Sequence, residues 1–116
     1  MTDPSCLFCK IAAGEIPAEL VHETPRVVAF RDVSPQAPVH VLVIPRSHVA
    51  SLAETEEAHA DLLAEVLLAA RSVAQAEGLA DAGYRCVVNT GDDGGQSVHH
   101  LHVHLLGGRS LGWPPG

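Results

Sequence analysis

Three histidines alternate with apolar residues near the C-terminal end of the sequence, in the run His-Leu-His-Val-His-Leu-Leu over residues 100–106. Side chains on a β-strand point alternately to its two faces, so we expect His100, His102 and His104 to share one face. Neighbouring histidines would stand roughly 6.6 Å apart, because a strand rises about 3.3 Å per residue. This spacing is short enough for the three imidazoles to build one site.

Three interpretations of this row are open from the residues alone. The histidines could be only the polar face of a half-exposed strand. Two histidines at positions i and i+2 could instead bind one zinc ion with a third ligand from elsewhere, as in a metal-dependent hydrolase. In the third interpretation a neutral imidazole attacks phosphorus as a nucleophile, while its neighbours hold the phosphate and the leaving group.

A glycine-rich segment, residues 89–97, leads directly into the histidines. Glycines allow backbone N–H groups to converge on an anion, and Ser97 adds a hydroxyl donor. The segment is not a phosphate-binding loop of the Walker type, because no Gly-Lys-Ser/Thr follows and no helix begins there. Its position beside the histidines favours the phosphoryl-transfer interpretation.

Cys6 and Cys9 form a Cys-x-x-Cys pair, which in a cytosolic protein indicates metal binding or redox chemistry. Free thiols on a short helix are the simpler alternative, and a redox pair lacks the βαβ helix start at which such pairs occur. The third cysteine, Cys86, lies in an apolar segment and is expected to be a small core residue. Three cysteines without a secretion signal argue against a disulfide scaffold.

The length and composition limit the class of protein. A chain of 116 residues, of which 47% are hydrophobic, is expected to fold as one domain over residues 1–116. No apolar run approaches the roughly 20 residues of a membrane-spanning helix, and the N-terminus lacks a signal sequence, so we expect a cytoplasmic protein that binds no membrane. The formal net charge of −7 argues against nucleic acid as a partner but allows a small anion.

Hydrophobic periodicity and turn residues predict the elements that must position these side chains. The expected strands are residues 20–23, 27–30, 39–44, 84–89 and 98–106. The expected helices are a short one over 6–13 and a long one over 55–77, with Thr55 as its N-cap. This order contains no regular βαβ alternation, so it favours an α+β fold with the long helix on one face of a five-stranded antiparallel sheet.

The run over residues 95–106 matches the His-φ-His-φ-His-φ-φ motif of the histidine triad (HIT) superfamily, including its preceding Gly-Gln-Ser. Other segments resemble the Hint branch, the purine nucleoside phosphoramidases: residues 16–18, 29–40, 43–45 and the terminal Trp-Pro-Pro-Gly at 113–116. The likeness covers nearly the whole chain. It implies a homodimer whose two sheets join into one ten-stranded sheet, with a nucleotide pocket in each subunit.

The resemblance also implies roles for individual residues. His102 would be the nucleophile, with His104 and Ser97 contacting the phosphate and the leaving amine, and the backbone carbonyl of His100 orienting His102. The implied nucleotide contacts are Asp32 and Val33 at the ribose, Asn89, Gly95, Gln96 and Ser97 at the phosphate, and Phe8, Ile11, Phe30 and Leu42 at the base. A histidine rather than a glutamine at the end of the triad implies hydrolysis instead of nucleotidyl transfer.

The resemblance supplies two further ligands for a zinc site. His48 and His100 resemble the residues that complete a Cys₂His₂ site in relatives with an N-terminal Cys-x-x-Cys, here Cys6 and Cys9. Four protein ligands leave no open position for water, so zinc would be a structural cofactor.

The sequence therefore predicts a nucleotide-binding hydrolase that cleaves nucleoside 5′-phosphoramidates or AMP conjugates, of AMP or GMP type, through a covalent nucleotidyl-histidine intermediate. The alternatives are a nucleotide-binding adaptor with incidental hydrolysis and a zinc-dependent metallohydrolase. Arg31 stands where similar proteins often have histidine, and His99 where they often have an aromatic residue, so base and leaving-group preference stay open. The roles of His40 and of Trp113, which could reach the pocket of a partner subunit, stay open as well.

Overall fold

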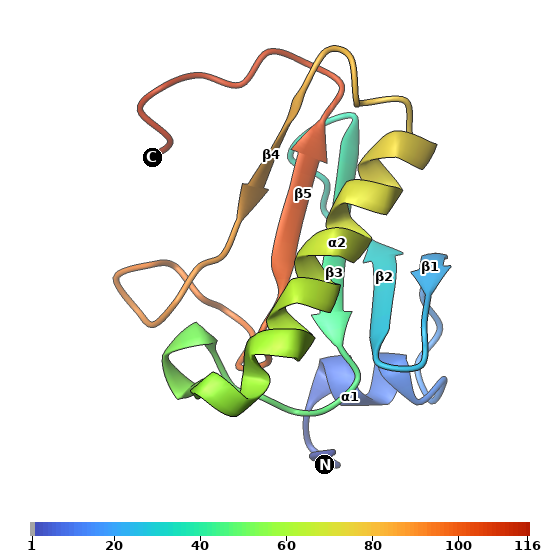
Figure 1. Ribbon diagram of the computed structural model, residues 1–116, viewed down its shortest axis with the longest axis vertical. Coiled ribbons are helices and arrows are strands. Elements are labelled where there is room, and N and C mark those ends of the chain that lie inside the picture. The colour runs from blue at the N-terminus through green and yellow to red at the C-terminus, as the bar shows by residue number, and fades with distance from the viewer. Residues whose placement is uncertain (1) are drawn as a thin grey trace.

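A five-stranded antiparallel sheet forms the centre of the computed structural model, which describes residues 2–116 (Figure 1). The strands are β1 (Leu20–Glu23), β2 (Val27–Arg31), β3 (Val39–Pro45), β4 (Tyr84–Val87) and β5 (Val103–Gly107), and their order across the sheet is β1-β2-β3-β5-β4. The helices are α1 (Leu7–Ala12) and α2 (Ala60–Ala76), and two 3₁₀ turns, Leu52–Glu54 and Glu57–His59, precede α2. The expected α+β fold is thereby confirmed.

The central strands β2 and β3 are apolar at almost every position because both faces of the sheet are covered there. Alternate residues of β2, β3 and β5 pack against α2 on one face. The residues between them on β2 and β3 pack against Phe8 and Ile11 of α1 on the other face. The two helices therefore stabilise two separate apolar clusters, one on each side of the sheet. Among the described residues, none of the helices has the length and apolarity that crossing a bilayer needs.

The long helix begins at Ala60, so the prediction that Thr55 is its N-cap is wrong. The Thr55 hydroxyl donates a hydrogen bond backwards to the Leu52 carbonyl, 2.7 Å away, and closes the first 3₁₀ turn. The second turn starts at Glu56, whose backbone N–H donates to Nδ1 of His59 at 2.8 Å. The hydrogen bonds of these two turns thus shift the start of the helix to Ala60. Its C-terminal end, next to Gly78 with a φ of 76°, agrees with the prediction.

The last two strands are shorter than predicted, because β4 ends at Val87 and β5 begins only at Val103. The segment between them is irregular and contains His100 and His102. The pairing of β3 with β5 reaches only Val43 and Val103, since the carbonyl of Pro45 accepts a hydrogen bond from the His100 ring and the N–H of Leu101 donates to Val49 instead. The regular alternation expected for the whole histidine row therefore starts at Val103.

Cys86 is exposed on β4, which corrects the expectation of a core residue. The strand β4 lies at the edge of the sheet, and α2 packs across β2, β3 and β5 (Figure 1). Tyr84 and Cys86 alternate with half-buried residues, so the apolar sequence of this segment reflects a face that the single chain leaves uncovered.

Candidate active site and metal site

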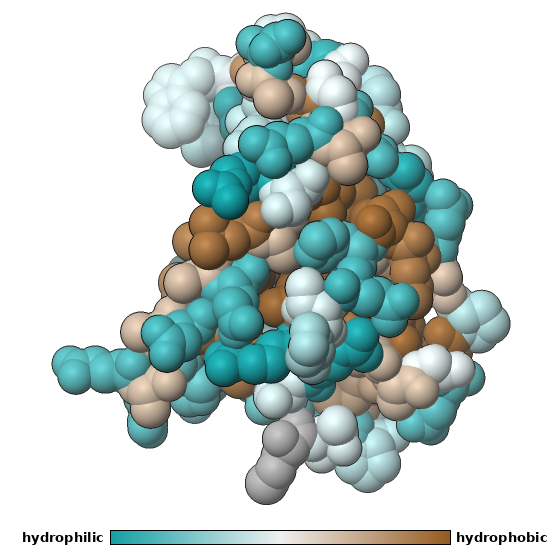
Figure 2. All heavy atoms as spheres, turned by 45° about the vertical axis from the view of Figure 1, so that its right-hand side comes forward, coloured by the Kyte–Doolittle hydropathy of each residue, from teal (hydrophilic) through white to brown (hydrophobic). Residues whose placement is uncertain are grey.

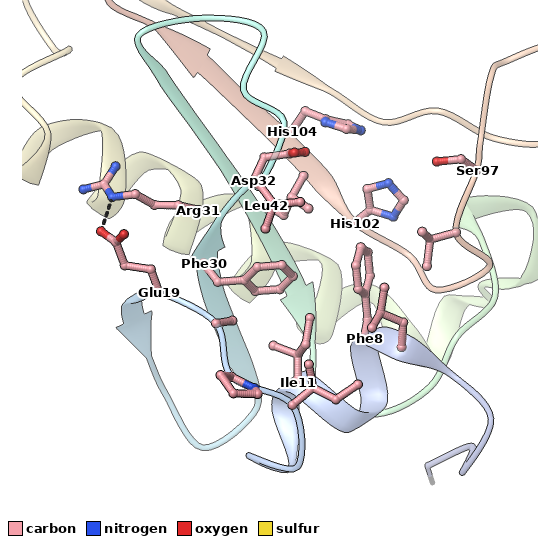
Figure 3. Close-up of a pocket in the computed structure, with 16 residues that line it drawn as sticks. Phe8, Ile11, Glu19, Phe30, Arg31, Asp32, Leu42, Ser97, His102 and His104 are labelled. Atoms are coloured by element: carbon pink, nitrogen blue, oxygen red, sulfur yellow. Dashed lines mark hydrogen bonds and ion pairs between the residues drawn. The ribbon is translucent and has the colours of Figure 1, made fainter.

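A cavity of about 520 Å³ opens on the face of the sheet that carries α1 (Figure 3). Ser97 and His102 lie at one end of it, and Glu19 and Arg31 lie at the other. The walls between are mostly apolar, and the phenyl rings of Phe8 and Phe30 meet edge to face with centroids 5.4 Å apart. The cavity therefore joins a polar, histidine-lined end to an apolar slot walled by aromatic and aliphatic side chains.

Most of the residues expected to bind a nucleotide line this cavity. They are Phe8, Ile11, Phe30, Asp32, Val33, Leu42, Ser97, His102 and His104. Asn89, Gly95 and Gln96 do not line it. The structure thus brings the expected base, ribose and nucleophile residues together with Ser97, whereas Asn89, Gly95 and Gln96 lie outside the cavity lining.

The glycine segment is held by hydrogen bonds within itself and to Ala50 and Val98. The carboxamide of Gln96 accepts from the Gly91 N–H and donates to the carbonyls of Ala50 and Val98 at 2.7 and 3.0 Å. The N–H groups of Gly95 and Gln96 donate to carbonyls within the same turn. These N–H groups are engaged in the turn, so the expected cradle for an anion is not formed by them, and Ser97 is the donor that this segment brings to the cavity.

The proton position on His102 follows from the backbone partner of its ring. Nδ1 of His102 lies 2.6 Å from the carbonyl oxygen of His100. A carbonyl can only accept, so Nδ1 carries the proton and donates it. The lone pair of the neutral ring is therefore on Nε2, in a buried side chain that lines the cavity. This is the arrangement that a nucleophilic imidazole needs.

His104 is oriented by His40, a residue whose role the sequence left open. The Gln36 N–H donates to Nδ1 of His40 at 3.0 Å, so the His40 proton sits on Nε2. This Nε2–H points to Nδ1 of His104 at 2.9 Å, and an Asp32 carboxylate oxygen lies 3.5 Å away from it. The His104 proton is therefore on Nε2. The backbone N–H of Gln36 therefore fixes the tautomers of both neutral imidazoles, His40 and His104.

Asp32, His40 and His104 could be taken for a metal site because their ligand atoms lie within 4.8 Å of one another. A metal ion on Nε2 of His40 would need the lone pair there and would move the proton to Nδ1. That proton would face the Gln36 N–H, which is itself a donor. The hydrogen bonds therefore favour a chain of imidazoles over a metal at this position.

A second cluster, which we call the Cys₂His₂ cluster, consists of Cys6, Cys9, His48 and His100, the four residues predicted as zinc ligands. Nδ1 of His100 lies 3.3 Å from Sγ of Cys6 and 3.5 Å from Sγ of Cys9. Nδ1 of His48 lies 3.4 Å from Sγ of Cys9. Ligands 2.0 to 2.3 Å from zinc stand roughly 3.3 to 3.8 Å apart in a tetrahedron. The donor set and the spacing both fit zinc.

The ring of His100 is prepared for this role by its other nitrogen. Nε2 donates to the Pro45 carbonyl at 2.8 Å, which leaves the lone pair on Nδ1 facing the sulfurs. His100 thus belongs to the Cys₂His₂ cluster, while His102 and His104 belong to the cavity. Across the described residues, no group of potential metal ligands contains two members of the histidine row. This division disfavours the interpretation of the row itself as a catalytic zinc site.

Three further residues were named from the sequence with their roles left open: Arg31, His99 and Trp113. The guanidinium of Arg31 is held by two carboxylates, with Nε 2.8 Å from Glu19 and Nη1 2.8 Å from Glu77. Both partners raise its pKa, so the group stays charged and tied to the end of α2. His99 is exposed, in line with its omission from the site, and the side chain of Trp113 is 82% exposed in the single chain.

Acidification will destabilise the fold through the hydrogen-bonded pair His104 and His40. Burial first, and then His102 and His40, lower the pKa of His104 from 6.5 to about 4, and burial also lowers the pKa of His40. Between these pH values the unfolded chain binds protons that the folded chain does not, so stability is lost as the pH falls from 6.5 to 4. For His104 we expect a loss of about 2 kcal/mol between pH 7 and pH 4.

Urea denaturation at several pH values measures this loss. His104→Gln, which removes the titrating ring, should flatten the pH profile relative to the wild type. An equally steep profile in the variant would show that other groups control the acid sensitivity.

Comparison with known proteins identifies the same family as the sequence motif. The HIT domain model matches residues 13–111. The chain is 50% identical over 117 residues to the Adenylylsulfatase HINT1 of Arabidopsis thaliana, covering 99% of this chain and 79% of that one. It is 50% identical over 118 residues to the 14 kDa zinc-binding protein of Zea mays, covering 100% and 91%. A HIT family hydrolase from Legionella pneumophila has the same fold, with a TM-score of 0.95, 54% identity and coverage of 97% and 100%.

Proposed function

The chain belongs to the HIT domain family, and we propose that it is a nucleotide-binding hydrolase that cleaves nucleoside 5′-phosphoramidates or related AMP conjugates through a nucleotidyl intermediate on His102. The observation that carries this proposal is the orientation of His102. Its Nδ1–H is fixed on the His100 carbonyl, and its Nε2 lone pair belongs to the cavity. The names of its HIT family relatives, a hydrolase and an adenylylsulfatase, support the reaction class.

In the first step Nε2 of His102 forms a bond to the α-phosphorus, and the bond from phosphorus to the leaving group breaks. The imidazole gains positive charge, which the His100 carbonyl stabilises at Nδ1–H. His104 presents its Nε2–H at the same end of the cavity, where it can donate to a phosphoryl oxygen or to the leaving nitrogen. In the second step water attacks the phosphorus and releases the nucleotide and His102.

The rest of the cavity suits a nucleoside. Phe8, Ile11, Phe30 and Leu42 provide apolar surface for a base, and ring stacking of this kind tolerates different purines. Asp32 is acceptor-only when ionised, so its carboxylate matches the paired hydroxyls of a ribose better than a phosphate. AMP-type or GMP-type substrates are therefore the proposed class.

We assign zinc to the Cys₂His₂ cluster as a structural cofactor. Bound there, it would tie the N-terminal segment to the sheet, because two of its ligands flank or lie in α1 and the other two, His48 and His100, follow β3 and precede β5. A relative named for zinc binding supports this assignment. The four protein ligands would leave no position for a reacting water.

We also propose that two chains associate through β4. This edge strand exposes Tyr84 and Cys86, and Val88 just beyond it is exposed as well. The face of the molecule in Figure 2 carries hydrophilic side chains with several apolar groups between them. Pairing of two β4 edges would extend the sheet to ten strands. Sedimentation velocity should give twice the 12.2 kDa of one chain, and a monomer at micromolar concentration would contradict the proposal.

Rapid quenching during turnover tests the reaction directly. With an adenosine 5′-phosphoramidate as substrate, mass spectrometry of the quenched protein should find an adenylyl group on the peptide that contains His102. A phosphoryl or adenylyl group on another residue, or none under conditions of steady turnover, would contradict the mechanism. Binding of AMP without turnover above background would leave the nucleotide-binding adaptor as the function.

His40→Ala should lower kcat by about 10- to 100-fold, because His104 loses the donor that fixes its proton on Nε2. The expected change is in kcat more than in KM, since His40 is not part of the cavity lining. His22→Ala, on the edge strand β1, is the matched control and should leave kcat unchanged. Urea denaturation of both variants separates loss of orientation from loss of fold, and a kcat for His40→Ala within about twofold of wild type would refute this role.

A further inference from the structure

The short helix α1 takes part in the Cys₂His₂ cluster and in the cavity at the same time. Cys6 caps its N-terminus and Cys9 lies in its first turn, and both thiols belong to the cluster. Phe8 stands between them in the sequence, and its side chain lines the cavity together with Leu7 and Ile11 (Figure 3). A movement of α1 would therefore change both sites.

His100 is the second connection between the sites. Its imidazole belongs to the Cys₂His₂ cluster, and its backbone carbonyl accepts the Nδ1–H of His102. The ring of Phe8 packs edge to face on both histidines, with centroid distances of 6.0 Å to His100 and 5.2 Å to His102. His100, a member of the cluster, thus contacts the nucleophile directly, and Phe8 contacts both of them and lines the apolar slot.

The position of α1 depends on these contacts because the helix has only six residues. Isolated helices of fewer than about 12 residues are unstable in water, so α1 needs its tertiary partners. On the sheet face opposite α1, the core between the sheet and α2 contains none of the α1 residues. The sheet and α2 can therefore stay folded while α1 is docked or released, which makes the docking of α1 a local equilibrium.

We propose that Phe8 and His100 are positioning residues through which metal binding in the Cys₂His₂ cluster and nucleotide binding in the cavity strengthen each other. A metal ion on Cys6, Cys9, His48 and His100 favours the docked position of α1. A nucleotide packed on Phe8 and Ile11 favours the same position. Each ligand then raises the affinity for the other by the same factor, because such coupling is reciprocal. This inference rests on the nucleotide and zinc sites of the proposed function.

Two binding measurements test the coupling without any use of turnover. Isothermal titration should give AMP an affinity at least about fivefold higher for zinc-loaded than for zinc-free protein. In the converse experiment, zinc is transferred at equilibrium from the folded, loaded protein to a chromogenic chelator. Saturating AMP should raise the zinc affinity of the protein by the same factor. Circular dichroism of the zinc-free protein checks that the sheet and α2 remain folded. If they do not, the chelator experiment on the loaded protein still decides.

Phe8→Ala isolates the connection. The variant should still bind zinc, but AMP should then change its zinc affinity by less than about twofold. Lys10→Ala, on the same helix but outside the cavity lining and the cluster, is the matched control and should keep the wild-type factor. Zinc and AMP that both bind wild-type protein with affinities independent of each other would overturn the coupling alone. Failure of either ligand to bind would overturn the proposed function and the coupling together.

Discussion

His102→Ala will lower kcat for hydrolysis of an adenosine 5′-phosphoramidate by about 10⁴-fold or more, while AMP affinity stays within about threefold of wild type. The large effect is expected because the variant removes the atom that bonds to phosphorus, and neither neighbouring imidazole can replace it. His100 faces the cysteine sulfurs, and His104 has its Nδ1 lone pair turned to His40. Steady-state kinetics and titration calorimetry measure the two quantities separately.

The matched control for this variant is His99→Ala. His99 is three residues from His102 and exposed, so its loss should leave kcat and AMP affinity unchanged. The free energy of unfolding of both variants should be compared, since His102 is buried and packs on Phe8. A His102→Ala protein that keeps its fold and more than about a tenth of the wild-type kcat would eliminate the nucleophile assignment and with it the covalent intermediate.

Local patterns in the sequence were sufficient for the central part of the fold. The strands β1, β2 and β3 lie where apolar runs and the turn around Pro25 predict them, within one residue at each end. The long helix ends beside Gly78 as predicted, but its start depends on the Thr55 hydroxyl, which bonds to Leu52 rather than to the helix. Competition between two such short-range hydrogen bonds is not visible in a hydrophobic pattern.

The candidate site was predictable to the extent that it depends on residue type. The alternating row led us to expect one site built by all three histidines, but His100 turns to the cysteines while His102 and His104 line the cavity. That division depends on two carbonyls that accept a ring N–H. The Pro45 carbonyl fixes the proton of His100 on Nε2, and the His100 carbonyl fixes the proton of His102 on Nδ1. The contact of His100 with Pro45 joins segments that are distant in the sequence. The contact of His102 with His100 lies in an irregular stretch of backbone.

His40 shows which information was missing. It lies on the same strand as Leu42, two residues away, and Leu42 pairs with His104. The register between β3 and β5 would have placed His40 beside His104, but one sequence does not fix that register. Cys86 was misassigned for a related reason, since an apolar segment at a sheet edge has the same composition as one in a core.

Cys9→Ala should reduce the free energy of unfolding of the zinc-loaded protein by about 3 kcal/mol or more, because it removes a buried ligand of a structural metal. The loss should be smaller than for a small zinc domain that unfolds entirely without metal, since the core under α2 does not depend on the cluster. Cys86→Ala is the matched control: the same chemical change at an exposed cysteine should cost less than about 0.5 kcal/mol. Urea denaturation with parallel metal analysis measures both.

The same pair of variants separates a structural metal from a catalytic one. If the metal only fixes α1, Cys9→Ala should retain kcat at saturating substrate within about tenfold, with a higher KM because the wall formed by Phe8 loosens. A catalytic zinc would instead make kcat fall together with metal content and leave the fold intact. Fewer than about 0.3 zinc ions per wild-type chain after expression with added zinc, or equal stability of the two cysteine variants, would remove the metal from the site. The positions of the ligands support a structural metal. All four lie together at the N-terminal end of α1, and none of them lines the cavity in which Nε2 of His102 lies.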